Sequence, residues 1–300
     1  MTTVPAVPRA QRPSVPAVAL VDGAELRYWT NYPSPPADTQ APVILMVHGF
    51  RGTHQGLELI ADNLPEFRVV SPDLPGFGAS PPMPGRNHDI AGYAAVIADL
   101  IRQLAAGPVV LLGHSFGSLI AARIAATEPA LVSSLVLVNS LATNTPANGG
   151  PSRMGLRAAS AYYRFAAAVP ARAGHVLLAS KAFTLSMSVM MAVTRDSQLR
   201  KDIHRRHLLH YSDFSDRAVL EQAFAAIADA DVGDYAADLS MRTLLIAGER
   251  DRMAPLPGQR WLLPRLPNGQ LKTIPGVGHL VHYEQPATAA ALIREFLASS

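Results

Sequence analysis

Short apolar runs alternate with amphipathic stretches through most of the chain. The runs at 43–50, 108–115, 131–140 and 242–251 have the near-continuous apolar pattern of strands that are buried on both faces of a parallel sheet. Segments with helical spacing, about 10–15 residues long, separate most of them. An Asp-Gly pair between two alternating segments at 18–32 predicts a β-hairpin near the start. The pattern therefore predicts an α/β fold built from βαβ units around a mostly parallel sheet.

The alternation stops between Leu141 and Tyr235. This stretch is rich in Ala, Met and Arg, has helical spacing and contains no clear strand, and the alternation returns after it. We therefore predict one core, residues 16–140 and 236–300, interrupted by a helical insertion, residues 141–235. Four prolines near the N-terminus predict a mobile, Pro-rich arm over residues 1–15.

Composition limits the functions that the chain can have. Its 300 residues are 49% hydrophobic and 16% charged, as expected of a globular protein, and the net charge of +3 without dense basic tracts argues against a nucleic-acid partner. The absence of cysteine excludes disulfides, thiolate catalysis and cysteine-ligated zinc. His204, His207 and His210 lie in a basic segment with no accompanying carboxylate pattern, so we expect a helix face there and no metal.

The N-terminal segment lacks the apolar run of a secretory signal. The longest apolar stretch, 182–194, is shorter than the ~20 residues of a membrane-spanning helix. We therefore expect a cytoplasmic protein, and the sequence leaves its oligomeric state open.

The segment GHSFG, residues 113–117, follows an apolar strand and precedes a helical pattern. This is the context of a nucleophile elbow, in which flanking glycines make room for a sharp turn that exposes the serine, here Ser115. The alternative is a structural Gly/Ser turn. A serine nucleophile also needs two backbone N–H groups for the oxyanion, and we expect Phe116 and Phe50 to supply them, with Arg51 as the other candidate for the second donor.

The serine needs a base, and the base needs an acid that orients it. A histidine after a late strand suits the first role. We favour His279 over His282, which we expect to pack beside the site. For the acid we favour Asp251, at the end of the preceding strand, over Glu249. Asn139 occupies another strand end where an acid could stand, but it carries no charge.

Taken together, these segments resemble the α/β-hydrolase superfamily, in particular its cap-bearing serine hydrolases. The resemblance covers about residues 20–140 and 236–300 and rests on five motifs: VHGF, DLPGFGAS, GHSFG, GERDRMAP and GVGH. The order Ser, Asp, His along the chain is that of this superfamily. The resemblance implies an eight-stranded, mostly parallel sheet flanked by helices, with a helical cap inserted after the sixth strand. Serine at the nucleophile position disfavours epoxide hydrolases and haloalkane dehalogenases, and the short HGF is similar to that of meta-cleavage-product hydrolases and haloperoxidase-like esterases.

The insertion supplies aromatic and thioether side chains that suit an apolar acyl pocket, although they could equally form the internal packing of the cap. The residues that we expect to touch substrate are His48, Gly49, His114, Phe165, Met187 and Met191. A cap that touches lipid would have the same composition, and a solvated basic face is the alternative for its cationic residues: Arg195, Arg200, Lys201, Arg205 and Arg206.

The sequence therefore predicts a serine hydrolase that needs no cofactor and acts on a small apolar carboxylic ester or thioester. A hydrolase that cleaves a C–C bond in a ring-cleavage product is one alternative, because it would use the same three residues. A non-catalytic ligand receptor on the same fold is the other.

Overall fold

The computed structural model describes residues 14–21, 23–31, 42–105, 107–142, 153–211 and 214–299. For residues 153–158 it describes the backbone alone. All but the end of the predicted N-terminal arm, residues 1–15, lies outside these ranges.

Eight strands form one mixed sheet in the order β1-β2-β4-β3-β5-β6-β7-β8. The strands are β1 (Val15–Val21), β2 (Ala24–Thr30), β3 (Val43–Val47), β4 (Arg68–Pro72), β5 (Val109–His114), β6 (Val132–Val138), β7 (Arg242–Gly248) and β8 (Gly269–Ile274). The pairs β1–β2 and β2–β4 are antiparallel, and β3 to β8 run parallel. The predicted hairpin and the predicted eight-stranded, mostly parallel sheet are both confirmed.

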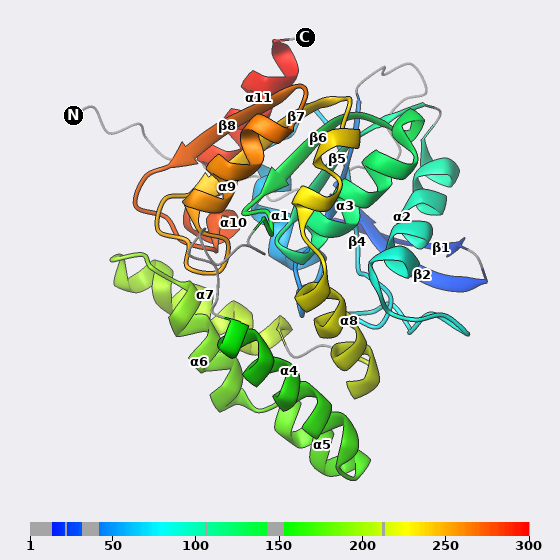
Figure 1. The fold of residues 1–300 in the computed structure, drawn as a ribbon, viewed down its shortest axis with the longest axis vertical. Helices are drawn as coiled ribbons and strands as arrows, with labels where there is room; N and C mark the ends of the chain where they lie inside the picture. The colour runs from blue at the N-terminus through cyan, green and yellow to red at the C-terminus, as the bar shows by residue number, and fades with distance from the viewer. Residues whose placement is uncertain are drawn as a thin grey trace.

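Helices cover both faces of the sheet (Figure 1). Those of the core are α1 (His54–Asp62), α2 (Ile90–Leu104), α3 (Phe116–Thr127), α9 (Leu256–Leu262), α10 (Val281–Glu284) and α11 (Pro286–Ala298). Single-turn 3-10 helices are η1 (Pro129–Leu131), η3 (Val232–Asp234), η4 (Ala236–Asp238) and η5 (Leu263–Arg265).

The central strands are apolar on both faces because each face has its own helical layer. In β3, Leu45 and Val47 pack into the cluster that contains α2 and α3, whereas Ile44 and Met46 pack into the cluster that contains α1 and α11. This two-sided burial explains the continuous apolar runs of the sequence. It also makes the sheet a rigid platform for the loops at the C-terminal ends of its strands.

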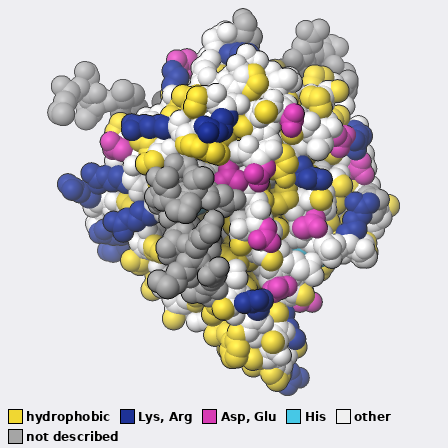
Figure 2. Space-filling view, in the orientation of Figure 1, with side chains coloured by type: hydrophobic (Ala, Val, Ile, Leu, Met, Phe, Trp, Pro, Cys, Tyr) yellow, Lys and Arg dark blue, Asp and Glu magenta, His cyan; other side chains and the backbone are white. Residues whose placement is uncertain are grey.

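Between β6 and β7, the described part of the chain carries five α-helices before η3 and η4, and we call residues 141–235 the cap segment. They are α4 (Arg153–Ala168), α5 (Ala171–Leu178), α6 (Lys181–Met191), α7 (Ser197–His210) and α8 (Arg217–Asp229). Helices α4 to α7 form a layer that extends below the sheet in Figure 1, and hydrophobic atoms share its lower tip with Lys and Arg in Figure 2.

Among the described residues, none of the helices combines the length and the apolar character needed to cross a membrane.

Candidate active site

Ser115 lies in a sharp turn between β5 and α3, with φ 51° and ψ −116°. A positive φ is rare for a residue with a side chain and costs conformational energy. The flanking glycines permit the turn. A Cβ on Gly113 would lie 2.3 Å from the carbonyl oxygen of Gly117, and one on Gly117 would lie 2.2 Å from that of Val47. The structure therefore has the strand–turn–helix geometry that the GHSFG motif predicts.

A hydrogen-bonded chain runs from Ser115 through His279 to Asp251. The Oγ of Ser115 lies 3.0 Å from Nε2 of His279, and Nδ1 of His279 lies 2.8 Å from Oδ2 of Asp251. A carboxylate only accepts, so the imidazole carries its proton on Nδ1 and leaves Nε2 free to accept the hydroxyl proton of the serine. The three groups come from the ends of β5, β7 and β8, brought together by the parallel sheet.

Asp251 is held as an anion by donors on every side. Its Oδ1 accepts the N–H groups of Met253 and Ala254 at 2.7 and 2.9 Å, and Oδ2 accepts from His279 and from the side-chain amide of Asn139. Burial opposes ionisation, but His279 and the backbone donors outweigh it, so the pKa of Asp251 is lowered below its usual value. The carboxylate therefore stays charged and fixed in orientation.

Asn139 is a positioning residue that the sequence analysis passed over as uncharged. It follows β6 with φ 49°, and its amide also donates to the carbonyl oxygen of Gly278, 3.0 Å away. It thus joins the loop of Asp251 to the loop of His279. Asn is one of the residue types that most often adopt a positive φ, so the residue type fits the backbone at this position. The partners of its side chain, however, depend on the order of the strands in the sheet.

The turn after β3 approaches the serine from the other side. The N–H of Gly52 closes the turn on the carbonyl oxygen of Gly49, 2.9 Å away, and a Cβ on Gly49 would lie 3.4 Å from that of Ser115. Phe50 is within this turn, and its ring packs edge-on against Phe116 with centroids 6.2 Å apart. Phe116 is the first residue of α3, whose leading N–H groups have no acceptor within the helix.

Arg51, the other candidate donor, sends its side chain into the cap segment. It is 1% exposed, has φ 58°, and donates to the carbonyl oxygens of Leu178 at 2.7 Å and Tyr211 at 3.2 Å. Its guanidinium also lies 4.9–5.4 Å from the ring centroids of Phe183, Tyr211 and Phe214. The turn beside Ser115 is thus anchored to the C-terminal ends of α5 and α7.

Glu284 makes a second connection to the cap segment. Its Oε1 accepts the N–H groups of Val193 and Thr194 at 2.7 and 2.8 Å, and its Oε2 accepts that of Gly278 at 2.9 Å. One buried carboxylate therefore holds the link between α6 and α7 against the residue that precedes His279.

The residues that we expected to touch substrate differ in their hydrogen-bond partners and in their burial. His48 is fixed by backbone, accepting from Leu74 and donating to the oxygen of Gly49 at 2.8 Å. His114 is buried behind His279 and donates to its carbonyl oxygen, and burial is the main cause that lowers the pKa of His114 to about 3. Within the cap segment, Met191 is buried and Met187 packs beside it in the cluster of Leu280, whereas Phe165 is 61% exposed.

The alternative base and acid make no contact with Ser115 or Asp251 among the hydrogen bonds of the described residues, and His282 packs beside the site as expected. His282 is buried, with its ring centroid 4.3 Å from that of His114, and burial holds its pKa well below the usual value. Glu249 is exposed and accepts the N–H of Gly276, 2.9 Å away. His204 and His207 both contact the hydroxyl of Ser188.

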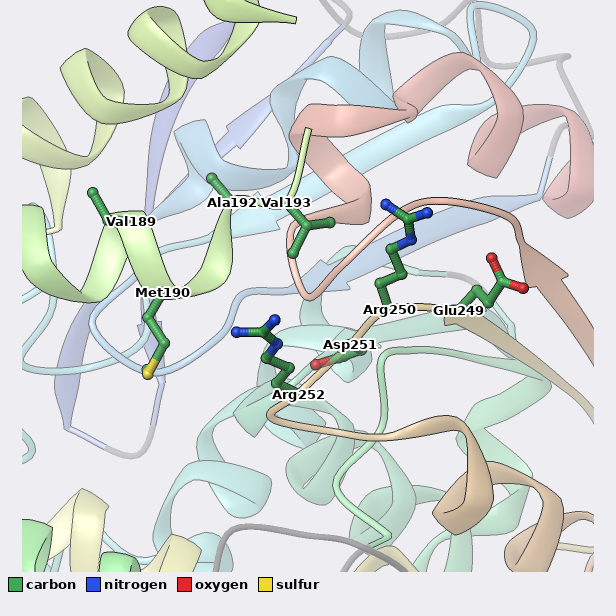
Figure 3. Close-up of a pocket in the computed structure, with 8 residues that line it drawn as sticks. All are labelled: Val189, Met190, Ala192, Val193, Glu249, Arg250, Asp251 and Arg252. Carbon is green, nitrogen blue, oxygen red and sulfur yellow. The ribbon is translucent and has the colours of Figure 1, made fainter. Parts of the chain in front are cut away.

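An open cleft of about 560 Å³ lies beside Asp251. Val189 and Met190 come from the end of α6 and Val193 from the link that follows it. Arg250 and Arg252 face them from the loop after β7 (Figure 3). One wall is thus apolar, and the other carries two cations and the carboxylates of Glu249 and Asp251.

Comparison with known proteins identifies the family. The sequence profile of the alpha/beta hydrolase fold matches residues 42–286, so the chain belongs to the α/β-hydrolase family and is a hydrolase. It is 26% identical to the pimeloyl-acyl-carrier-protein methyl ester esterase of Aeromonas salmonicida, over 86% of this chain and 96% of that one. It is 36% identical to lipase LipV of Mycobacterium tuberculosis over 32% of this chain and 36% of that one. The structure of a thermophilic esterase from Thermogutta terrifontis is 25% identical, with a TM-score of 0.71 over 96% of this chain and 98% of that one.

Proposed function

We propose that this α/β-hydrolase cleaves a carboxylic ester or thioester of apolar character, with Ser115, His279 and Asp251 as its catalytic triad and without a cofactor. The observation that carries the proposal is the continuous chain of hydrogen bonds from Ser115 to Asp251, with the half-buried serine on a strained turn. Similarity to esterases and a lipase supports the choice of an ester.

The reaction proceeds in two halves. Nε2 of His279 takes the hydroxyl proton of Ser115, and Oγ attacks the acyl carbon. The N–H groups of Phe50 and Phe116 donate to the oxyanion, and Asp251 stabilises the imidazolium. His279 then protonates the departing alcohol or thiol, which leaves an acyl-enzyme on Ser115. Water, deprotonated by His279, attacks the same carbon, and the carboxylic acid leaves as Ser115 recovers its proton.

The cap segment, residues 141–235, would cover the triad on a core of residues 16–140 and 236–300. Met187 and Met191 suit an apolar acyl pocket, because flexible thioethers adapt to different chains and both pack near Leu280, which follows His279. Gly49 lies beside Ser115 and has no side chain, so it leaves room for the acyl group to approach the serine. His48 and His114 suit a supporting role, since backbone groups already occupy both ring nitrogens of His48 and Nε2 of His114.

Hydrolysis of p-nitrophenyl esters from acetyl to palmitoyl tests the proposal, with the Ser115→Ala variant alongside. We expect turnover with an optimum chain length, and loss of at least about 10³ in kcat in the variant. Folded protein that turns over no ester but cleaves a vinylogous diketone would favour C–C hydrolysis. Saturable binding of either compound without turnover would favour a receptor.

A further inference from the structure

Helix α6 buries polar side chains and exposes apolar ones. Thr184 and Ser188 are 1% and 0% exposed, whereas Leu185, Val189 and Met190 are 40%, 60% and 41% exposed. A helix on the surface of a globular domain ordinarily turns its apolar stripe toward the core. The outward face of α6 is therefore suited to an apolar environment that the rest of the described chain does not supply.

Helix α7 lies beside α6 and continues this surface. The hydroxyl of Ser188 lies 2.7 Å from Nδ1 of both His204 and His207, so the polar side of α6 is satisfied against α7. We call eight of the exposed residues of the two helices the α6–α7 face: Lys181, Leu185, Val189, Met190, Lys201, Arg205, Leu208 and Leu209.

The charge around this face is predominantly positive. Residues 153–210 contain ten of the 26 Lys and Arg of the chain but only two of its 23 Asp and Glu. Arg205 forms an ion pair with one of the two, Asp202, but that pair is exposed and therefore weak. A second copy docking through this face would bring cations against cations. The charge instead fits an anionic partner, and apolar side chains interspersed with Lys and Arg are typical of helices that lie at a lipid–water interface.

The α6–α7 face also reaches the candidate active site. Val189 and Met190 belong both to the face and to the wall of the open cleft beside Asp251. Arg250 and Arg252 lie on the other wall of that cleft, beside Glu249 and Asp251 (Figure 3). Glu284 fixes the link between α6 and α7 to the His279 loop, so the face is held rigidly next to the site.

We propose that the α6–α7 face docks on the surface of a bilayer that contains anionic phospholipid. Leu185, Val189, Met190, Leu208 and Leu209 enter the interfacial region, and Lys201 and Arg205 contact the lipid phosphates. The cleft then opens toward the bilayer, with Arg250 and Arg252 facing the headgroups. The proposal concerns binding alone and does not depend on which bond the site cleaves.

Co-sedimentation with vesicles tests this proposal. The full chain is mixed with vesicles of equal phosphatidylglycerol and phosphatidylcholine, or with vesicles of phosphatidylcholine alone. Each mixture is measured at about 0.05 M salt and at about 0.5 M salt. We expect binding to the anionic vesicles that weakens with salt. Because each cation near an anionic surface contributes about fivefold to partitioning, the Lys201→Glu/Arg205→Glu variant should bind at least about 25-fold more weakly.

Two further variants separate lipid docking from a purely electrostatic attraction to anions. Leu185→Ser/Val189→Ser should weaken binding about tenfold without changing its salt dependence, because it removes inserted apolar area and no charge. Arg260→Glu/Arg265→Glu makes the same charge change on the core and should bind like the wild type.

Three results would overturn the proposal. The first is equal sedimentation with both vesicle types. The second is a Leu185→Ser/Val189→Ser variant that binds like the wild type, which would indicate a general polyanion or acidic-protein site. The third is a concentration-dependent dimer that the same variant abolishes, which would assign the face to a second copy of the chain.

Discussion

Replacing Asp251 by Asn keeps the shape of the side chain and removes its charge. In the wild type, the two carboxylate oxygens accept four hydrogen bonds, two from backbone N–H groups and one each from His279 and Asn139. An asparagine has only one oxygen to accept them. If that oxygen accepts from the two backbone N–H groups, the NH₂ group of the new asparagine faces the donors of His279 and Asn139.

The imidazole can relieve this conflict by moving its proton from Nδ1 to Nε2. Nε2 would then donate to Ser115 and could not take the hydroxyl proton. The wrong tautomer and the missing negative charge together should lower kcat by about 10⁴, which corresponds to about 5 kcal/mol of transition-state stabilisation. The donor still facing Asn139 should cost about 1–3 kcal/mol of folding stability.

The assay is hydrolysis of p-nitrophenyl butyrate by Asp251→Asn, with the melting temperature measured for each protein. Glu249→Gln is the matched control, because Glu249 is the neighbouring acid on the same loop and its exposed carboxylate accepts from the backbone of Gly276, away from His279. We expect Glu249→Gln to keep wild-type activity. An Asp251→Asn variant within tenfold of the wild type, or equal losses in both variants, would refute the reasoning.

Further variants and conditions test other parts of the site. Gly117→Ala should lower the free energy of unfolding by more than about 2 kcal/mol in a urea titration, because its Cβ would lie 2.2 Å from the carbonyl oxygen of Val47; a neutral effect would contradict the geometry of the turn. Glu284→Gln leaves one NH₂ group facing backbone donors, so it should lower both the melting temperature and kcat; wild-type values for both would show that the link is dispensable. Lowering the pH from 7.5 to 5.5 should destabilise the fold, since the unfolded chain takes up protons near pH 6.5 that buried histidines with lowered pKa values do not accept. Below that pH, each histidine that stays neutral in the folded protein contributes up to about 1.4 kcal/mol per pH unit, and a free energy of unfolding in urea that does not change with pH would refute the reasoning. The histidines are His48, His114, His207 and His282.

The sheet and its order along the chain could be predicted because the signals are local. Each central strand is buried on two faces, so its apolar run stands out, and glycines mark the sharp turn at Ser115. Ser115, His279 and Asp251 follow strand ends, and parallel strands bring such ends to one edge of the sheet. Their hydrogen bonds agree with the prediction, while their catalytic roles stay a prediction.

The cap segment was harder to predict because helical spacing alone does not show which face turns inward. We expected Phe165 to line a pocket, but α4 turns Tyr163 and Ala166 toward the core and leaves Phe165 exposed. The roles of Asn139 and Glu284 depend on contacts between segments far apart in the chain, 112 residues from Asn139 to Asp251 and 91 from Glu284 to Val193. No local pattern reports such contacts.

The central claim is that Ser115 is a nucleophile activated by His279. The most direct measurement is reaction with a fluorophosphonate, followed by mass spectrometry of the peptide that contains Ser115. The account predicts one stable adduct on Ser115 in the wild type, none in Ser115→Ala, and labelling slower by at least about 10³ in His279→Ala. An adduct on another residue, or labelling of Ser115 at the same rate without His279, would contradict it.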